Sequence, residues 1–550
     1  MVNYIEQVAT LFTKQNEKAR PNQVENNASG YGFQLDSFTR LNRWLILGTD
    51  GGSYYATERE MTAENARVVE TCLNENGLKT VQTIVEISKS GRAPKNAPAI
   101  FALAMAAGHD NPETRKAALQ ALPEVARTGT DLFHFARDVE NFRRWGRGLR
   151  TAIATWYGEK SPEELGYQAI KYKQRDGWSH RDLLRLSHPK PQHQTQAALY
   201  RYIVGGMDAI QQENTRGQPV HAQNLPPLIQ AFEEAKRAPK ERLLTLVREN
   251  HLTHEMLPTA WKNDAAIWEA MLPQMPQTAL LRNLGKMTAL GLLTPQSTAS
   301  RLVTTRLTDT ERLRRARIHP VSILATLNIY KKGQGERATR RDNALSWSPN
   351  SEVVDALNDS FHLAFQTIEP SKQKHLLALD VSSSMASGTI AGFPGLTPRI
   401  ASAAMAMTTA RVEPHHQTVA FASAGMTFGP KNNAGLMPLP ISPNQRLDDI
   451  LDTVNKLPFG GTDCALPMIW AQKNKVEVDK FIIYTDNETW AGEIHPFQAL
   501  RDYRQKMSRN AKLIVVGMTA TAFTIADPND QNMLDIIGFD PTTPQLLTSF

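Results

Sequence analysis

The sequence predicts a multidomain protein in which an α-helical repeat region is followed by a C-terminal α/β domain. Before about residue 370, apolar residues recur at helical intervals and alternating strand patterns are scarce. After that point, short apolar segments alternate with helical ones. At 550 residues the chain is also too long for one ordinary core. We therefore expect a helical domain over residues 1–369 and an α/β domain over residues 370–550.

The helices of the first part are indicated by apolar residues spaced three and four positions apart, between breaks at Pro, Gly and Asn. Clear examples lie at residues 96–110, 111–128, 226–237 and 277–293. A further helix within residues 348–370 should start at a capping Ser or Asn and stop at Pro370. Short amphipathic helices in series indicate a solenoid of the HEAT or armadillo kind, which curves around a concave surface.

The second part alternates strand-like and helical segments. The predicted strands cover residues 375–380, 417–423, 426–429, 479–486 and 511–518. The predicted helices cover residues 398–412, 447–457, 464–473 and 496–507. Such alternation is typical of a mostly parallel sheet with helices on both faces.

Three polar side chains follow the first of these strands at the spacing D-x-S-x-S, namely Asp380, Ser382 and Ser384. Further along, Thr462 lies on a glycine-rich loop and Asp486 ends another apolar strand. The carboxyl ends of parallel strands share one sheet edge, where such loops meet. These hard oxygen ligands suit Mg²⁺ or Mn²⁺. The alternative is a set of unrelated loop caps, since Ser, Thr and Asp are ordinary turn residues.

This pattern resembles the metal-ion-dependent adhesion site of a von Willebrand factor A domain. The resemblance implies that Asp380, Ser382, Ser384 and Thr462 approach the ion directly, and that Asp486 acts through water.

Basic and aromatic residues cluster between Arg137 and Lys190. The basic members are Arg137, Arg143, Arg144, Arg147, Arg150, Lys171, Lys173, Arg175, His180, Arg181, Arg185 and His188, with Trp145, Trp156, Tyr157, Tyr172 and Trp178 among them. We expect Arg143, Arg144, Arg147 and Arg150 to share one helix. Cations neutralise phosphates and aromatic faces stack on unpaired bases, so the cluster favours nucleic-acid contact. For any single residue the alternative is a solvated arginine paired with a nearby acid, or an aromatic ring in the core.

Charge and composition narrow the class of protein. Residues 371–550 hold 15 basic and 16 acidic side chains, whereas the whole chain holds 62 and 55, so the positive excess lies before residue 371. That excess favours an anionic partner.

Only two cysteines occur, Cys72 and Cys464, which predicts a reducing compartment without disulfides. No apolar run is long enough to span a bilayer, and the first twenty residues lack a signal core. We therefore expect a cytoplasmic protein without membrane contact.

The two halves together resemble the Ro ribonucleoprotein family, also called TROVE proteins, over nearly the whole chain. The stretches that carry the resemblance are residues 41–55, 171–191, 317–335 and 376–385. The second, KYKQRDGWSHRDLLRLSHPKP, is long and idiosyncratic. The resemblance, which is to bacterial Ro proteins in particular, implies a toroid in which helical repeats form the ring and the A domain closes it. We expect this ring to be a monomer.

The resemblance also implies partners. Ro proteins bind small noncoding Y RNAs on an outer basic face and take single-stranded 3′ ends of misfolded RNAs into a central hole. Matching positions make Lys171, Arg175 and His188 the best candidates for direct RNA contact, although a helix-terminal cap is the main alternative for His188, which precedes Pro189. For bacterial relatives, an exoribonuclease such as polynucleotide phosphorylase is implied as a protein partner.

Three functions compete at this point: an RNA-binding scaffold for RNA quality control, a metal-dependent protein-recognition module, and a metal-dependent hydrolase. D-x-S-x-S lacks the second acid of D-x-D phosphatases, and no pairing of nucleophile and base is visible, so we expect no catalysis. The segment GTDGGSYY, from Gly48 to Tyr55, lacks the Lys-Ser/Thr of a P-loop and is interpreted as a structural turn.

Overall fold

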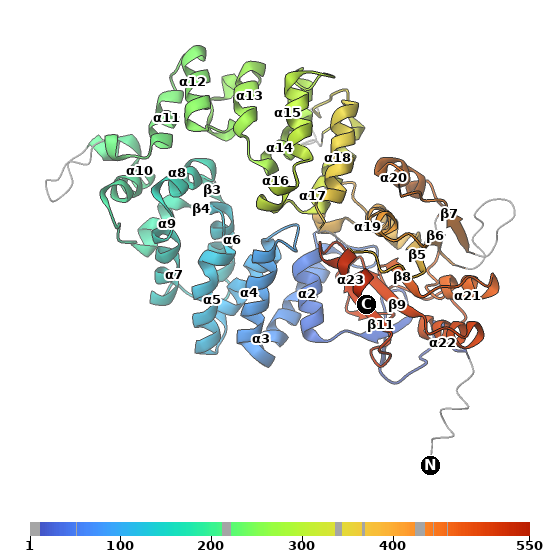
Figure 1. The fold of residues 1–550 in the computed structure, drawn as a ribbon. Helices are drawn as coiled ribbons and strands as arrows, with labels where there is room; N and C mark the ends of the chain where they lie inside the picture. Colours follow the sequence, from blue (N-terminus) through green and yellow to red (C-terminus); the bar gives the residue numbers. More distant parts are fainter. Residues whose placement is uncertain are drawn as a thin grey trace.

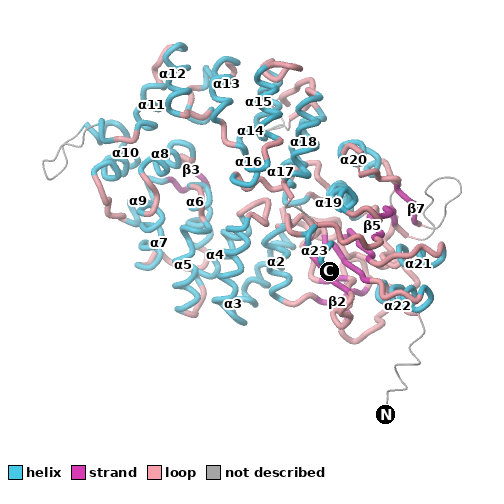
Figure 2. The backbone as a smooth tube through the Cα atoms, viewed as in Figure 1, coloured by secondary structure: helices cyan, strands magenta, loops and turns pink. Residues whose placement is uncertain are grey.

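A ring of helices is closed by an α/β domain in the computed structural model (Figure 1). The structure describes residues 12–50, 52–211, 222–335, 344–365, 369–423, 435–443, 445–458 and 460–550. Starting beside the α/β domain, the helices turn through a curve and return to it, and strands gather almost entirely in that domain (Figure 2). The predicted fold, a helical-repeat ring with a C-terminal A domain, is confirmed.

The ring is built from consecutive short helices with one long exception. They are α2 (Ser37–Leu47), α3 (Glu58–Ser90), α4 (Ala97–Gly108), α5 (Pro112–Val125), α6 (Gly129–Val139), α7 (Arg147–Gly158), α8 (Pro162–Lys171), α9 (His180–Ser187), α10 (Gln194–Gln211), α11 (Pro227–Ala235), α12 (Lys240–Asn250), α13 (Ala265–Met271), α14 (Gln277–Ala289), α15 (Thr298–Leu307), α16 (Thr310–Arg315), α17 (Pro320–Lys332) and α18 (Ser351–Leu363). Neighbours pack on one another in the solenoid manner, for example α3 with α5 and α5 with α7.

Local sequence explains where the helices begin and end. The side chain of Asn111 caps α5 by accepting from the backbone N–H of Glu113 at 2.8 Å. The side chain of Asn350 caps α18 in the same way. The end predicted for α18 at Pro370 was wrong, because the helix ends at Leu363, where the backbone N–H of Ala364 bonds back to Ser360.

The A domain contains a six-stranded sheet in the order β11-β9-β8-β5-β6-β7. Its strands are β5 (His375–Asp380), β6 (His416–Phe421), β7 (Leu436–Leu439), β8 (Lys480–Thr485), β9 (Lys512–Gly517) and β11 (Met533–Ile537), and only β7 pairs antiparallel. The covering helices are α19 (Pro398–Val412), α20 (Leu447–Asn455), α21 (Leu466–Lys473), α22 (Pro496–Met507) and α23 (Thr543–Ser549).

Both faces of this sheet are buried, as its parallel pairing requires. Leu377 and Leu379 of the central strand β5 belong to a core shared with α19, whereas Leu376 and Ala378 belong to a second core with α21 and α22. Each predicted α/β helix and four predicted strands are present, while the predicted strand at residues 426–429 lies outside the described residues.

Several short strands were not predicted. In the N-terminal part, β1 (Gln23–Glu25) and β2 (Tyr31–Gln34) form a three-stranded sheet with β10 (Phe523–Thr524) of the A domain. A hairpin of β3 (Gln174–Arg175) and β4 (Trp178–Ser179) packs on α6. Strands of two to four residues show no readable periodicity, and β2 finds its second partner almost 500 residues away.

Both cysteines are buried and unpaired. Over the described ranges, no helix combines the length and the apolar character needed to cross a bilayer.

Candidate functional site

The predicted basic cluster is divided between several surfaces. Helix α6 ends at Val139 and α7 begins at Arg147, after Gly146 in an extended conformation. The prediction that Arg143 and Arg144 share a helix with Arg147 was therefore wrong, because the chain turns between them.

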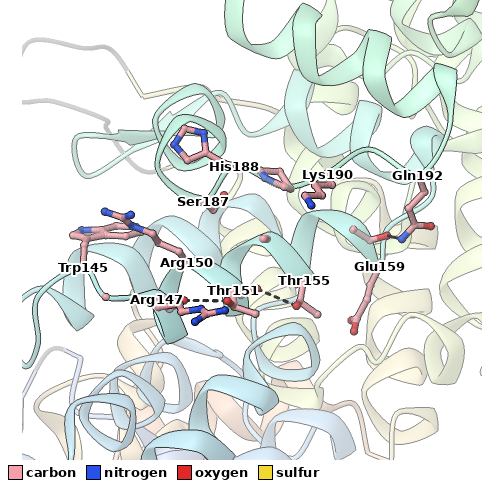
Figure 3. A pocket seen from close by; sticks show the side chains of 14 residues that line it. Trp145, Arg147, Arg150, Thr151, Thr155, Glu159, Ser187, His188, Lys190 and Gln192 are labelled. Atoms are coloured by element: carbon pink, nitrogen blue, oxygen red, sulfur yellow. Dashed lines mark hydrogen bonds between the residues drawn. The ribbon is translucent and has the colours of Figure 1, made fainter.

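One group of these residues lines a groove of about 880 Å³ between α7 and the segment that follows α9 (Figure 3). Arg147 and Arg150 contribute from α7, and His188 and Lys190 from the opposite wall. Trp145, half-buried, adds an aromatic face packed 5.4 Å from the Trp178 ring. The groove thus offers four basic side chains and an aromatic face at one end, which suits a phosphate backbone with unpaired bases.

His188 lies exposed in this groove with an unusual backbone conformation. It ends α9 at φ 47° and ψ 53°, in the left-handed region, and its backbone N–H bonds to Leu184 O at 3.0 Å. The alternative of a helix-terminal cap is therefore correct for the backbone of His188. The residue is exposed and lines the groove, and such backbone outliers often persist at functional sites.

A second group lies around the end of α8 and the β3–β4 hairpin. Lys171 is half-buried, and its Nζ donates to the hydroxyl of Tyr167 at 2.8 Å and lies 5.5 Å from the Tyr172 ring. Lys173 is exposed, with its Nζ 5.5 Å from the Phe232 ring. Arg175 is exposed on β3. Lys171 therefore does not line the groove that contains His188.

The remaining predicted arginines differ in how strongly the protein holds them. Arg137 forms ion pairs with Asp138 and Asp176, each at 2.7 Å, and the hydrogen bond to Asp138 helps to raise its pKa. Arg143 donates to the carbonyl of Ala107 at 2.8 Å. Arg144, Arg147 and Arg185 are exposed, and within the described part of the chain no carboxylate lies within 4.0 Å of them.

Some members of the cluster belong to the core. Trp156 and Tyr157 are fully buried, and the Tyr157 hydroxyl is 2.8 Å from Nδ1 of His180. Burial lowers the pKa of His180 to about 4, so this imidazole is neutral near pH 7 and cannot attract phosphate. For Trp156 and Tyr157 the core alternative is correct, because their spacing on α7 reflects packing, and His180, counted among the basic residues, lies in the core as well.

The predicted metal ligands meet at the carboxyl edge of the sheet. Asp380 ends β5, and its Oδ1 accepts from the backbone N–H of Ser382 at 2.9 Å. The hydroxyls of Ser382 and Ser384 are 3.1 Å apart. Asp486 follows β8, the neighbour of β5, and lies close to Ser384. The loop that carries Thr462 reaches the same turn through a 3.1 Å bond from Ser383 N to Gly460 O.

The chemistry of these donors fits a hard cation. The hydroxyl oxygen of Thr462 is buried and has no hydrogen-bond partner among the described residues, which is rare for a buried polar atom. Burial and the charge of Asp380 raise the pKa of Asp486 to about 7. A divalent ion between the two acids would relieve this repulsion. In the described ranges no three His, Cys, Asp or Glu side chains are arranged to hold one ion, so the hydroxyls would have to complete its coordination.

Two residues near this edge escaped sequence reasoning. Glu488 is buried two positions after Asp486, and burial together with the Asp486 charge raises its pKa to about 8. Tyr55, from the loop between α2 and α3, lies close to Ser384, and burial together with the nearby acids raises its pKa. Glu488 could have been suspected from the run TDNE, but nothing in the sequence places Tyr55 beside Ser384.

These features define a class: a ring of helical repeats closed by a von Willebrand factor A domain with an oxygen-lined site at its sheet edge. Family models agree with that class, since the TROVE domain matches residues 24–252 and 248–328 and the Ro60 vWA domain matches residues 374–550.

Known proteins resemble the chain over its whole length. An "RNA-binding protein RO60" of Deinococcus radiodurans is 39% identical over 554 residues, covering 100% of this chain and 99% of the relative. A protein of the same name from Caenorhabditis elegans is 35% identical, covering 98% and 91%. The crystal structure of Deinococcus radiodurans RO (RSR) protein superposes with a TM-score of 0.67 over 94% of this chain and 99% of that one. The chain belongs to the Ro family.

Proposed function

We propose that this chain is an RNA-binding Ro protein that acts as a scaffold in RNA quality control. The observation that carries the proposal is the groove between α7 and the end of α9, which Arg147, Arg150, His188 and Lys190 line together with Trp145. Relatives that are 39% and 35% identical over nearly their full length are named RNA-binding proteins, which supports the same function here.

The RNA partners are small noncoding Y RNAs on the outer basic face and single-stranded 3′ ends of misfolded RNAs in the ring. A folded RNA is read largely by shape and phosphate position, which suits exposed cations spread over α7, α9 and the β3–β4 hairpin. The exposed members of the predicted set are Arg137, Arg144, Arg147, Lys173, Arg175, Arg185 and His188. An exoribonuclease such as polynucleotide phosphorylase is the proposed protein partner, so that any cleavage comes from the partner.

The A domain supplies a site for Mg²⁺ or Mn²⁺. Asp380, Ser382, Ser384 and Thr462 would contact the ion, and Asp486 would hold it through water. Such an ion neutralises the buried acids and fixes the loops that carry them. A site of this kind binds without a nucleophile or base, so we propose that the chain is not an enzyme by itself.

Sequencing the RNA that copurifies with the chain tests the main proposal. Small structured noncoding RNAs should be enriched over a mock purification. Absence of RNA binding by the pure protein at low salt would contradict the proposal and would favour the alternative, a metal-dependent protein-recognition module without an RNA role.

A further inference from the structure

The oxygen-lined site of the A domain is closed off from solvent. Its predicted ligands Asp380, Ser382, Ser384, Thr462 and Asp486 are 0%, 1%, 4%, 1% and 4% exposed. Glu488 beside them is 1% exposed. A site that receives a carboxylate from another protein needs an accessible coordination position. The enclosure here must therefore come from other parts of this chain.

One segment that covers the oxygen-lined site is the loop between α2 and α3, which belongs to the ring. Tyr55 of this loop lies close to Ser384 and to the buried acids of the site. Thr389, in the segment after Ser384, donates from its hydroxyl to Asp50 O at 3.1 Å. At Gly388 a Cβ would lie 2.8 Å from the carbonyl oxygen of Gly52, and φ is +74°. The two loops are thus in backbone contact, and Gly388 permits it.

A second cover is the N-terminal segment, residues 12–34, which contacts both other loops of the site. The side chain of Gln15 is fully buried and donates to Asp463 Oδ1 at 2.7 Å and to Ile494 O at 2.8 Å. Asn26 donates to Thr489 O at 2.8 Å. Each loop that carries a predicted ligand is therefore bound to residues from the first 55 of the chain.

Glu488 connects this cover to the acids of the site. One of its oxygens accepts from the Asn27 side chain at 2.6 Å. Its other oxygen, Oε2, is buried and has no hydrogen-bond partner among the described residues. A buried carboxylate oxygen needs a donor or a cation. The water shell of an ion held beside Asp486 would supply that donor.

We propose that the chain itself encloses the ion of this site, with Tyr55 covering the side on which an open adhesion-type site would take a partner's carboxylate and Glu488 orienting bound water. The ion would then fasten the start of the ring to the A domain. Tyr55 and Glu488 are positioning residues. This inference rests on the metal binding proposed above and assigns its role to ring closure.

Terbium(III), which prefers the same hard oxygen ligands, provides the test, since its luminescence is sensitised by an aromatic ring only at close range. Measurements use the full chain in a Trp490→Phe background. The backbone N–H of Trp490 donates to Thr462 O, so its indole lies near the site and would otherwise sensitise terbium as well. Tyr55→Phe should abolish most of the sensitised emission while calorimetry still detects bound terbium. Tyr172→Phe is the matched control, because Tyr172 ends α8, across the ring from the A domain (Figure 1), and this change should leave emission unchanged.

Glu488 and the closed coordination position are tested by calorimetry with Mg²⁺. Glu488→Gln should weaken Mg²⁺ binding roughly 10- to 100-fold, as loss of an outer ligand does. Glu493→Gln, on the same loop and paired with Lys14 at the surface, should not. Acetate, the simplest carboxylate, should leave the affinity of the unmodified chain for Mg²⁺ unchanged.

The outcomes separate this inference from the metal proposal. If neither Mg²⁺, Mn²⁺ nor terbium binds the unmodified chain, the metal proposal itself is wrong. If metal binds but emission survives in Tyr55→Phe, or acetate strengthens Mg²⁺ binding, the ion is not enclosed by the chain and the site is open to a partner.

Discussion

The side chain of Thr485 donates a 2.7 Å hydrogen bond to Oδ2 of Asp380. The two residues end the neighbouring parallel strands β8 and β5, so this bond joins the strand ends from which the candidate ligands project. Asp380 has its other oxygen fixed by Ser382 N. The carboxylate is therefore oriented before any ion binds, which lowers the entropic cost of binding.

Replacing Asp380 by Asn should remove metal binding and leave RNA binding intact. The amide keeps the volume of the side chain but loses its charge, and burial already raises the pKa of Asp380 because the protein disfavours that charge. Mg²⁺ should raise the melting temperature of the wild type and have no effect on that of Asp380→Asn. A variant that still binds Mg²⁺ with wild-type affinity would disprove the assignment of Asp380 as a ligand.

Acid should destabilise the fold through His180. Its folded-state pKa, about 4, lies below the unfolded value near 6.5, so the unfolded state takes up a proton first as the pH falls. The contribution of neutral His180 to the free energy of unfolding is fully present above about pH 6.5 and is lost as the pH falls toward about 4. The full loss is about 3 kcal/mol.

The measurement is the free energy of unfolding by urea at several pH values, for wild type and His180→Gln. Other groups titrate in both proteins and cancel in the difference. The stability advantage of the wild type should shrink as the pH falls. A constant difference would show that His180 is not buried in its neutral form.

Sequence patterns were most reliable in the A domain. The helix at Pro398–Val412 was predicted with its observed bounds, because Thr397 caps it, Pro398 begins it and the apolar run is unbroken. Asp380 and Asp486 could be placed at one edge since the carboxyl ends of parallel strands meet there. The edge strand Leu436–Leu439 was missed, because it contains Pro438 and pairs only with β6.

The contacts between the ends of the chain could not be predicted. Tyr55 and Ser384, or Gln15 and Asp463, are hundreds of residues apart in the sequence, and no local pattern encodes their proximity. In the basic region, composition located the cluster of basic and aromatic residues but not which of their side chains are exposed. Trp156 and His180 look suited to RNA in the sequence, yet they pack in the core.

RNA affinity should depend on Arg147 and Arg150 through their charge. Each exposed guanidinium that neutralises a phosphate adds about 0.7 to the log-log salt slope for single strands, so Arg147→Gln with Arg150→Gln should flatten the slope by roughly 1.4. The pair Lys171→Ala with Arg175→Ala should flatten it less, by roughly 1, because Lys171 is bound to Tyr167. Affinity is measured at several salt concentrations.

The matched control for this salt titration is Arg501→Gln with Lys506→Gln on α22 of the A domain, which removes the same charge from another exposed surface. The control should lower affinity little and leave the slope nearly unchanged. Equal effects in the control and in the Arg147 and Arg150 variant would mean that only net charge matters and that the groove is not the site.

Two substitutions of His188 should distinguish a role as a helix cap from a role in RNA contact. Its left-handed backbone favours Gly or Asn, so His188→Asn should fold with stability within about 1 kcal/mol of the wild type, while His188→Ala should be less stable. Both variants lose the imidazole from the groove, and both should bind structured Y-like RNA more weakly. A plain single strand should be affected less, because the proposed contact is to a folded RNA surface. If His188→Asn retains full affinity for structured RNA and only His188→Ala is impaired, the residue matters as a helix end alone, and the RNA contact belongs to its neighbours in the groove.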